Sequence, residues 1–189
     1  LENEGMKIHY TEDTNQILVQ KEDTLVVYTP AIPSKNLELS YFIENNYIVM
    51  KRSEVLGKIT EDHFTIAIAG THGKTTTSTM IAHILHDSGM DCTAFLGGVS
   101  TNYNSNLIFG TEKSVVVVEA DEFDRSFLTL TPDVAVITSV DADHLDIYEN
   151  KEKLISAFSD FTNKIKSGGT LFLEENIDKS VVNRDDISV

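Results

Sequence analysis

The spacing of apolar residues along the chain alternates between two patterns. Residues 64–70 (FTIAIAG), 114–121 (SVVVVEAD) and 133–140 (DVAVITSV) contain continuous apolar runs, typical of parallel strands that are buried on both faces. Residues 74–89 and 151–169 instead place apolar side chains three or four positions apart, which predicts helices. Strands that alternate with helices predict an α/β fold with a three-layer, mostly parallel sheet.

The later helix has the clearest periodicity. Leu154, Phe158, Phe161 and Ile165 share one face, and we expect Gly168 to end the helix. In the earlier helix, Gly89 stands where a glycine commonly follows a helix end. Residues 170–176 (TLFLEEN) predict a further strand, whereas 92–98 (CTAFLGG) fit a strand or a loop.

The first sixty residues have a weaker pattern. Short β-rich runs at 6–10 (MKIHY), 24–30 (TLVVYTP) and 47–51 (YIVMK) predict strands, and 34–47 predicts a helix with Ser34 as its N-cap. Residues 52–60 predict a short helix or linker. We therefore expect two domains: residues 1–61, the C-terminal portion of a Rossmann-like domain with a connector, and residues 62–189, the P-loop type domain.

Composition narrows the classes of partner and compartment. The net charge is −15, with 30 acidic and 15 basic residues, so nucleic acid and anionic membranes are poor candidate partners. A single cysteine, Cys92, excludes an internal disulfide and fits a reducing compartment. The sequence has no apolar run of about 18 residues and no signal-peptide pattern, so we expect a cytoplasmic protein without membrane insertion. Because it starts at Leu1 and ends at DDISV, we expect a piece of a longer protein.

Residues 66–77 (IAIAGTHGKTTT) resemble a phosphate-binding loop between a strand and a helix. The usual G-x-x-x-x-G-K-[ST] pattern would place its first glycine where Ile68 stands, whereas here it is Gly70. Helix N-termini present unpaired amides to phosphate, lysine adds a positive charge, and a threonine hydroxyl can coordinate Mg²⁺. The alternative is a strand–helix turn with a solvated lysine. The candidate phosphate-binding residues are Gly70, Thr71, His72, Gly73, Lys74, Thr75 and Thr76.

Two further candidates follow later apolar runs. Glu119 ends SVVVVE, and His144 follows VAVITSV within DADHLD. Because the carboxyl ends of neighbouring parallel strands meet at one edge, we expect both to lie near Thr75 and to complete a Mg²⁺ site. The alternatives are an exposed strand-end acid and a loop histidine. The acids of EADEFD lie near the same edge, and Glu119 is favoured among them because it terminates the strand.

Three segments, GTHGKTTT, VEADEFDRSFL and DADHLDIY, together resemble the Mur ligases. Across that family the loop lacks the early glycine, and a histidine at the position of His72 marks the branch that adds L-alanine and its close relatives. The family has a UDP-sugar domain, a central ATPase domain and a C-terminal domain. The resemblance implies that residues 1–61 end the first domain, that 62–189 form much of the central one, and that the third is absent.

The resemblance also implies a reaction: ATP-dependent amide ligation of L-alanine to UDP-N-acetylmuramate in peptidoglycan precursor biosynthesis, through an acyl phosphate. Lys74 and the loop amides would hold the ATP phosphates, while Thr75, Glu119 and His144 would serve Mg²⁺. Sister branches use a modified lysine a little after the D-H-x-D motif. In this chain the corresponding segment, LISAFSDF, contains no lysine. Two alternatives stay open: a ligase that attaches a recycled peptide to UDP-N-acetylmuramate, and a nucleotide-binding module without ligase activity. We expect this piece alone to be inactive.

Overall fold

The computed structural model describes residues 2, 5–122, 125–141, 148 and 150–189. By its internal contacts the chain forms two compact units, Leu1–Val55 and Leu56–Val189.

The first unit contains a two-stranded parallel sheet, as expected for the end of a Rossmann-like domain. β1 (Leu25–Tyr28) pairs with β2 (Ile48–Lys51), and α1 (Leu37–Glu44) connects them. Two single-turn 3₁₀ helices, η2 (Thr14–Gln16) and η3 (Lys21–Asp23), precede the strands.

Two expectations for this unit are wrong. Residues 6–10 form no strand, although their β-branched and aromatic residues favour one, because no neighbouring strand pairs with them in the described chain. The N-cap of α1 is Asn36, not Ser34. The Asn36 side chain accepts a hydrogen bond from the Leu39 amide at 2.8 Å, which satisfies one of the free amides of the first turn.

Helix α2 (Arg52–Asp62) matches the short helix expected over 52–60. It spans both the division between the units at Val55 and the domain boundary expected near Glu61.

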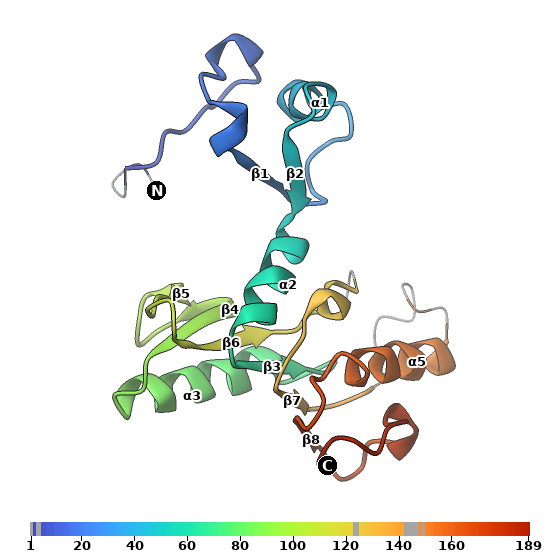
Figure 1. Ribbon diagram of the computed structural model, residues 1–189. Helices are drawn as coiled ribbons and strands as arrows, with labels where there is room; N and C mark the ends of the chain where they lie inside the picture. Colours follow the sequence, from blue (N-terminus) through green and yellow to red (C-terminus); the bar gives the residue numbers. More distant parts are fainter. Residues whose placement is uncertain (1, 3–4, 123–124, 142–147, 149) are drawn as a thin grey trace. The chain divides into compact units, whose positions relative to one another are not determined.

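The second unit is built on a six-stranded sheet with the order β5-β4-β6-β3-β7-β8. All neighbouring pairs are parallel except β4 with β5, so the sheet is mostly parallel, as predicted (Figure 1). The carboxyl ends of β3, β6 and β7 therefore lie at one edge. The strands are β3 (Thr65–Ala69), β4 (Cys92–Ser100), β5 (Ser105–Ile108), β6 (Val115–Glu119), β7 (Val134–Ile137) and β8 (Thr170–Leu173).

Helices cover both faces of this sheet, which gives the expected three layers. α3 (Lys74–Asp87) packs on the face that presents Ile68 and Val117, whereas α5 (Lys151–Thr162) packs on the face of Ala67 and Val118. The side chains of neighbouring strand residues thus alternate between two apolar clusters, and the continuous apolar runs follow from burial on both faces. Gly89 has φ of +80° just beyond α3, as predicted.

The apolar face of α5 carries the core of its layer. Phe161 stacks on Phe127 of η4 (Ser126–Thr129) with ring centroids 5.1 Å apart, and Phe158 meets the same ring edge-on at 5.6 Å. The helix ends earlier than expected, with Asn163 as its C-cap, so Gly168 lies in the following turn rather than at the helix end. Ile165 is nevertheless buried, as its spacing predicted.

The carboxyl-terminal segment returns to the end of α5. The Arg184 guanidinium donates to the backbone oxygens of Thr162, Asn163 and Ile165, and it also pairs with Asp186 at 2.6 Å. This side chain satisfies carbonyl groups that the end of a helix leaves without intrahelical partners. η5 (Lys179–Val181) lies in the same segment.

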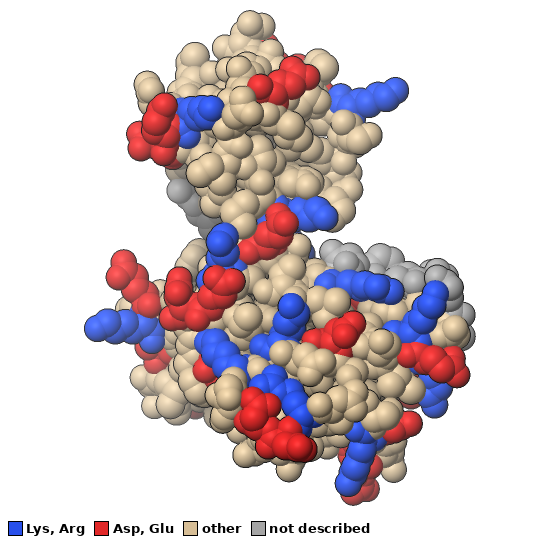
Figure 2. Space-filling model, turned by 45° about the vertical axis from the view of Figure 1, so that its right-hand side comes forward, with Lys and Arg blue, Asp and Glu red and all other residues tan. Residues whose placement is uncertain are grey.

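Charged side chains of both signs are interspersed on the face shown in Figure 2. Within the described part of the chain, no helix combines the length and apolar character needed to cross a bilayer.

Candidate functional site

The GTHGKTTT loop joins β3 to α3 at the carboxyl edge of the sheet. β3 ends at Ala69 and α3 starts at Lys74, as expected, and Thr76 lies in the first turn of the helix. Gly73 is the N-cap with φ of +79° and provides no side-chain hydrogen bond to the helix. The N-terminal amides of α3 therefore have no side-chain cap from this residue, which is the arrangement that binds anions.

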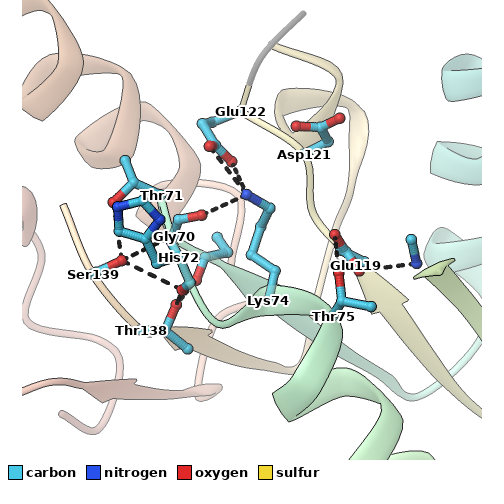
Figure 3. Close-up of polar contacts among 12 residues, drawn as sticks. Gly70, Thr71, His72, Lys74, Thr75, Glu119, Asp121, Glu122, Thr138 and Ser139 are labelled. Atoms are coloured by element: carbon cyan, nitrogen blue, oxygen red, sulfur yellow. Dashed lines mark hydrogen bonds and ion pairs between the residues drawn. The ribbon is translucent and has the colours of Figure 1, made fainter. Parts of the chain in front are cut away.

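The end of β7 holds the loop in place (Figure 3). Ser139 accepts from the His72 amide through its hydroxyl at 2.8 Å, and its carbonyl accepts from the Thr71 amide at 3.1 Å. The Thr138 hydroxyl donates to the carbonyl oxygens of Ala69 and His72. These contacts fix the first half of the loop against the neighbouring strand.

Gly70 is required by the same packing. Its φ of +134° is a conformation that side chains rarely adopt, and an added Cβ would overlap Thr138 Oγ1 and lie 2.9 Å from the Ser139 amide nitrogen. The glycine thus stands where β7 approaches the loop most closely. This packing explains why the first glycine of the loop stands at position 70. Position 68 lies within β3, where the Ile68 side chain is fully buried.

His72 lies on the exposed side of the loop. Its Nε2 is 3.8 Å from a carboxylate oxygen of Asp141, and both side chains are more than half exposed. Thr71 is almost fully buried, and its hydroxyl contacts the Ser139 hydroxyl at 2.9 Å. Thr71 therefore supports the loop, while the imidazole of His72 faces solvent.

Lys74 extends from the start of α3 back across the loop. Its Nζ donates to the Gly70 carbonyl at 2.7 Å and contacts the two carboxylate oxygens of Glu122 at 2.9 and 3.1 Å. The side chains are 13% and 1% exposed, respectively, so this is a buried ion pair. Such a pair must be matched by close contacts because burial removes the hydration of both charges.

Thr75 and Glu119 meet at the same edge, as the strand-end argument predicts. Thr75 Oγ1 donates to Glu119 Oε1 at 3.1 Å, and the Gly97 amide of β4 donates to the other oxygen, Oε2, at 2.9 Å. A hydroxyl and a carboxylate oxygen are the hard donors that Mg²⁺ prefers. This pair therefore fits a magnesium ion bound beside the first turn of α3.

His144, the third expected metal ligand, lies outside the described residues. The same is true of Asp143 and Asp146, which flank His144 in the sequence, and of Asp124, which follows Glu122 by two positions. Among the residues that are described, no group of three or more His, Cys, Asp or Glu side chains has the spacing of a metal site. The roles of Glu119 and His144 at a metal site remain predictions.

Sequence reasoning missed the supporting residues of the site. It set Glu122 aside in favour of the strand-end acid Glu119, and it gave no role to Gly97, Thr138 or Ser139. The position of Ser139 after an apolar strand was the one available indication, because the ends of neighbouring strands share an edge. The contact between Glu122 and Lys74 depends on the path of the chain after β6, which no local pattern encodes.

A pocket of about 660 Å³ opens beside the loop on the β7 side. It extends from Thr138 and Ser139 to Lys151 and Glu174, and the residues that line it are Thr138, Ser139, Val140, Asp141, Lys151, Ile155, Glu174, Asn176, Ile177, Asp178 and Val181.

Comparison with known proteins decides the family. Residues 68–187 match the Mur ligase middle domain, and residues 1–64 match the Mur ligase family catalytic domain. The chain belongs to the Mur ligase family. Mur ligases are ATP-dependent, so the loop described above lies in a family that uses nucleotide.

The relatives include a curated protein of Cytophaga hutchinsonii named UDP-N-acetylmuramate–L-alanine ligase, which is 49% identical over 100% of this chain and 42% of its own length. Among solved structures, UDP-N-acetylmuramate–alanine ligase MurC from Thermotoga maritima has a TM-score of 0.71 and 27% identity, covering 90% of this chain and 39% of that one. The murein peptide ligase Mpl from Psychrobacter arcticus has a TM-score of 0.67 and 28% identity, covering 80% and 36%. This Mur ligase chain thus spans about two fifths of the length of such relatives.

Proposed function

We propose that this Mur ligase chain carries the nucleotide-phosphate site of an enzyme that joins L-alanine to UDP-N-acetylmuramate at the expense of ATP. The observation that carries the proposal is the loop from Gly70 to Thr75, with its uncapped helix N-terminus, its lysine and a threonine–carboxylate pair beside it. The whole reaction would belong to the longer protein, because the chain spans 42% of the Cytophaga relative.

In the proposed site the ATP phosphates lie at the start of α3. The amides of the first turn and the Lys74 ammonium would balance the phosphate charge. The pocket that extends from Ser139 toward Lys151 lies beside the loop, so a nucleoside attached to those phosphates would have space on that side.

Thr75 Oγ1 and Glu119 Oε1 would hold Mg²⁺, with His144 as a further predicted ligand. The ion would supply charge neutralisation for the transferring phosphoryl group. Gly97 keeps the Glu119 carboxylate beside Thr75 by donating to its other oxygen. The residues of this chain therefore position the phosphates and the metal and reduce repulsion between them.

The chemical need for this site follows from the substrates. A carboxylate is a poor electrophile, and it repels the γ-phosphate. Phosphorylation of the muramoyl carboxylate gives an acyl phosphate and ADP. The amine of L-alanine then attacks the acyl carbon and phosphate leaves, which forms the amide. Lys74 would screen the repulsion in the first step.

Similarity favours L-alanine over a recycled peptide as the second substrate. The Cytophaga relative named as an alanine ligase is 49% identical over the whole chain. The solved alanine ligase and murein peptide ligase are 27% and 28% identical, so the solved structures do not separate the two reactions. A nucleotide-binding module without ligase activity remains the second alternative, and the threonine–carboxylate pair argues against it because simple binding needs no second metal ligand.

The test is a substrate panel with the full-length protein that contains this chain. Phosphate release is measured with ATP, Mg²⁺ and UDP-N-acetylmuramate in the presence of single amino acids or of the recycled peptide. The proposal predicts release with L-alanine and its loss in Lys74→Met. Phosphate release only with the peptide would identify the recycling ligase. Nucleotide binding without phosphate release under any of these conditions would support a nucleotide-binding module without ligase activity.

A further inference from the structure

Glu122 is a buried carboxylate that contacts Lys74 at the end of the loop (Figure 3). It comes three residues after the end of β6, from a different segment than the loop itself. Its side chain is 1% exposed and that of Lys74 is 13% exposed, so water contributes little to either charge.

The ammonium of Lys74 is shared between the Gly70 carbonyl and the Glu122 carboxylate. An ammonium has three N–H donors. Lys74 Nζ donates hydrogen bonds to the Gly70 carbonyl at 2.7 Å and to Glu122 Oε1 at 3.1 Å, and Glu122 Oε2 lies 2.9 Å away as an ion-pair contact. A phosphate oxygen that binds this ammonium therefore competes with the Glu122 carboxylate for the same positive charge.

The backbone of Glu122 is held independently of its carboxylate. The fully buried Tyr148 donates its hydroxyl to the Glu122 carbonyl, and the Arg125 amide donates to the same oxygen at 3.1 Å. The backbone of Glu122 therefore keeps the carboxylate close to the loop. The carboxylate would stay close to a bound phosphate after Lys74 has turned away, and two like charges in a buried site repel strongly.

We propose that Glu122 is a competing counterion for Lys74, which holds the ammonium when the loop is empty and opposes nucleotide phosphates when the loop is filled. The inference rests on the proposed function, since it requires phosphates at this loop. Glu122 is then a positioning residue: its charge weakens phosphate binding and promotes release of the spent nucleotide by taking the lysine back.

The test is calorimetric titration of the chain with Mg-ADP. Glu122→Gln keeps the size and an acceptor but removes the charge, so we expect the Kd to fall about tenfold, the scale of one hydrogen bond to a charged group. Glu122→Asp keeps the charge and should stay within about threefold of the wild type. Asp121→Asn is the matched control, because it removes one negative charge from the neighbouring residue. In Figure 3 no contact of Lys74 goes to Asp121, so the Kd of this variant for Mg-ADP should equal that of the wild type.

Adenosine supplies the control ligand. It carries no phosphate, so its affinity should be equal in wild type and Glu122→Gln. Weaker or unchanged Mg-ADP binding in Glu122→Gln, with an unchanged thermal unfolding midpoint, would overturn the inference. An equal gain in Asp121→Asn would also overturn it, because the effect would then come from net charge alone.

Two further results keep the inference separate from the proposed function and from misfolding. If the wild type does not bind Mg-ADP, the proposed nucleotide site fails and the inference with it. If Lys74→Met weakens binding but Glu122→Gln does not tighten it, only the inference fails. If Glu122→Gln does not fold, Glu122→Met takes its place, because it also removes the charge: the Kd for Mg-ADP should again fall, and an unchanged or higher Kd contradicts the inference.

Discussion

Gly97 offers the sharpest test of how the predicted metal ligand is positioned. Its amide donates to Glu119 Oε2 at 2.9 Å, while Thr75 contacts the other oxygen at 3.1 Å. With Oε1 on Mg²⁺ beside Thr75, the amide would still hold Oε2. Gly97→Ala would place a Cβ 2.5 Å from the Glu119 carboxyl carbon, and it would overlap both carboxylate oxygens.

The magnitude follows from this geometry. Ordinary contacts of a Cβ lie at 3.4 Å or more, so the carboxylate has to move by roughly an ångström and loses the Gly97 hydrogen bond. A hydrogen bond to a charged group contributes about 1.5–3 kcal/mol, which corresponds to about a 10- to 100-fold loss of Mg²⁺ affinity. The carboxylate itself remains in the variant, so the loss measures its position alone.

The assay is the Mg²⁺ dependence of ADP binding by the chain, measured by calorimetry at several Mg²⁺ concentrations. Gly98→Ala is the matched control: its Cβ would lie 3.2 Å from the Thr75 methyl group, which can give way, so we expect about a twofold change or less. Equal Mg²⁺ dependence in Gly97→Ala and wild type would refute the proposed role of Glu119. Equal losses in both alanine variants would refute the argument from the Gly97 contact.

Three further predictions concern stability and reactivity. Phe161→Ala should lower the free energy of unfolding by about 3–5 kcal/mol in urea melts, because it removes the ring that stacks on Phe127. Replacement of the exposed Phe172 of β8 by alanine should change it little, and similar losses in both variants would contradict the core described here. Burial, with a smaller effect of the neighbouring Asp91, raises the pKa of the Cys92 thiol to about 11. Iodoacetamide at pH 8 should therefore alkylate the native chain far more slowly than the urea-unfolded chain. Equal alkylation rates would be evidence against burial of Cys92. Hydrogen bonding from Arg184 lowers the pKa of the Asp186 carboxyl to about 2. Its contribution is complete above the unfolded pKa near 3.8 and is lost as pH falls toward 2, so the stability difference between wild type and Asp186→Asn should shrink over that interval; a difference independent of pH would contradict it.

Local sequence patterns predicted most of the second unit, but they gave no strand at β5 and left β4 open between a strand and a loop. The continuous apolar runs predicted β3, β6 and β7 because strands covered on both faces need apolar residues at every position. The helical spacing predicted α5 and its buried face, including Phe158 and Phe161. Element ends were less predictable: Asn163 ends α5 before Gly168, since a C-cap depends on local hydrogen bonds that several residue types can make.

The site was predictable only in part, for a physical reason. The motif gave the loop, Lys74 and Thr75, and the shared strand edge gave the contact of Thr75 with Glu119. The residues that hold these groups were not predictable. Glu122 and Gly97 reach the site through the path of the chain and through the register of β4 beside β6, which arise only after folding.

The central claim is that the loop from Gly70 to Thr76 binds nucleotide phosphates with Mg²⁺. The most direct measurement is an amide NMR titration of the ¹⁵N-labelled chain with Mg-ADP, compared with Lys74→Met. We predict that the largest shift changes fall on the amides of Gly73, Lys74, Thr75 and Thr76, and that Lys74→Met weakens them at the same ligand concentration. Shift changes confined to other parts of the chain, or equal titrations of wild type and variant, would contradict the claim.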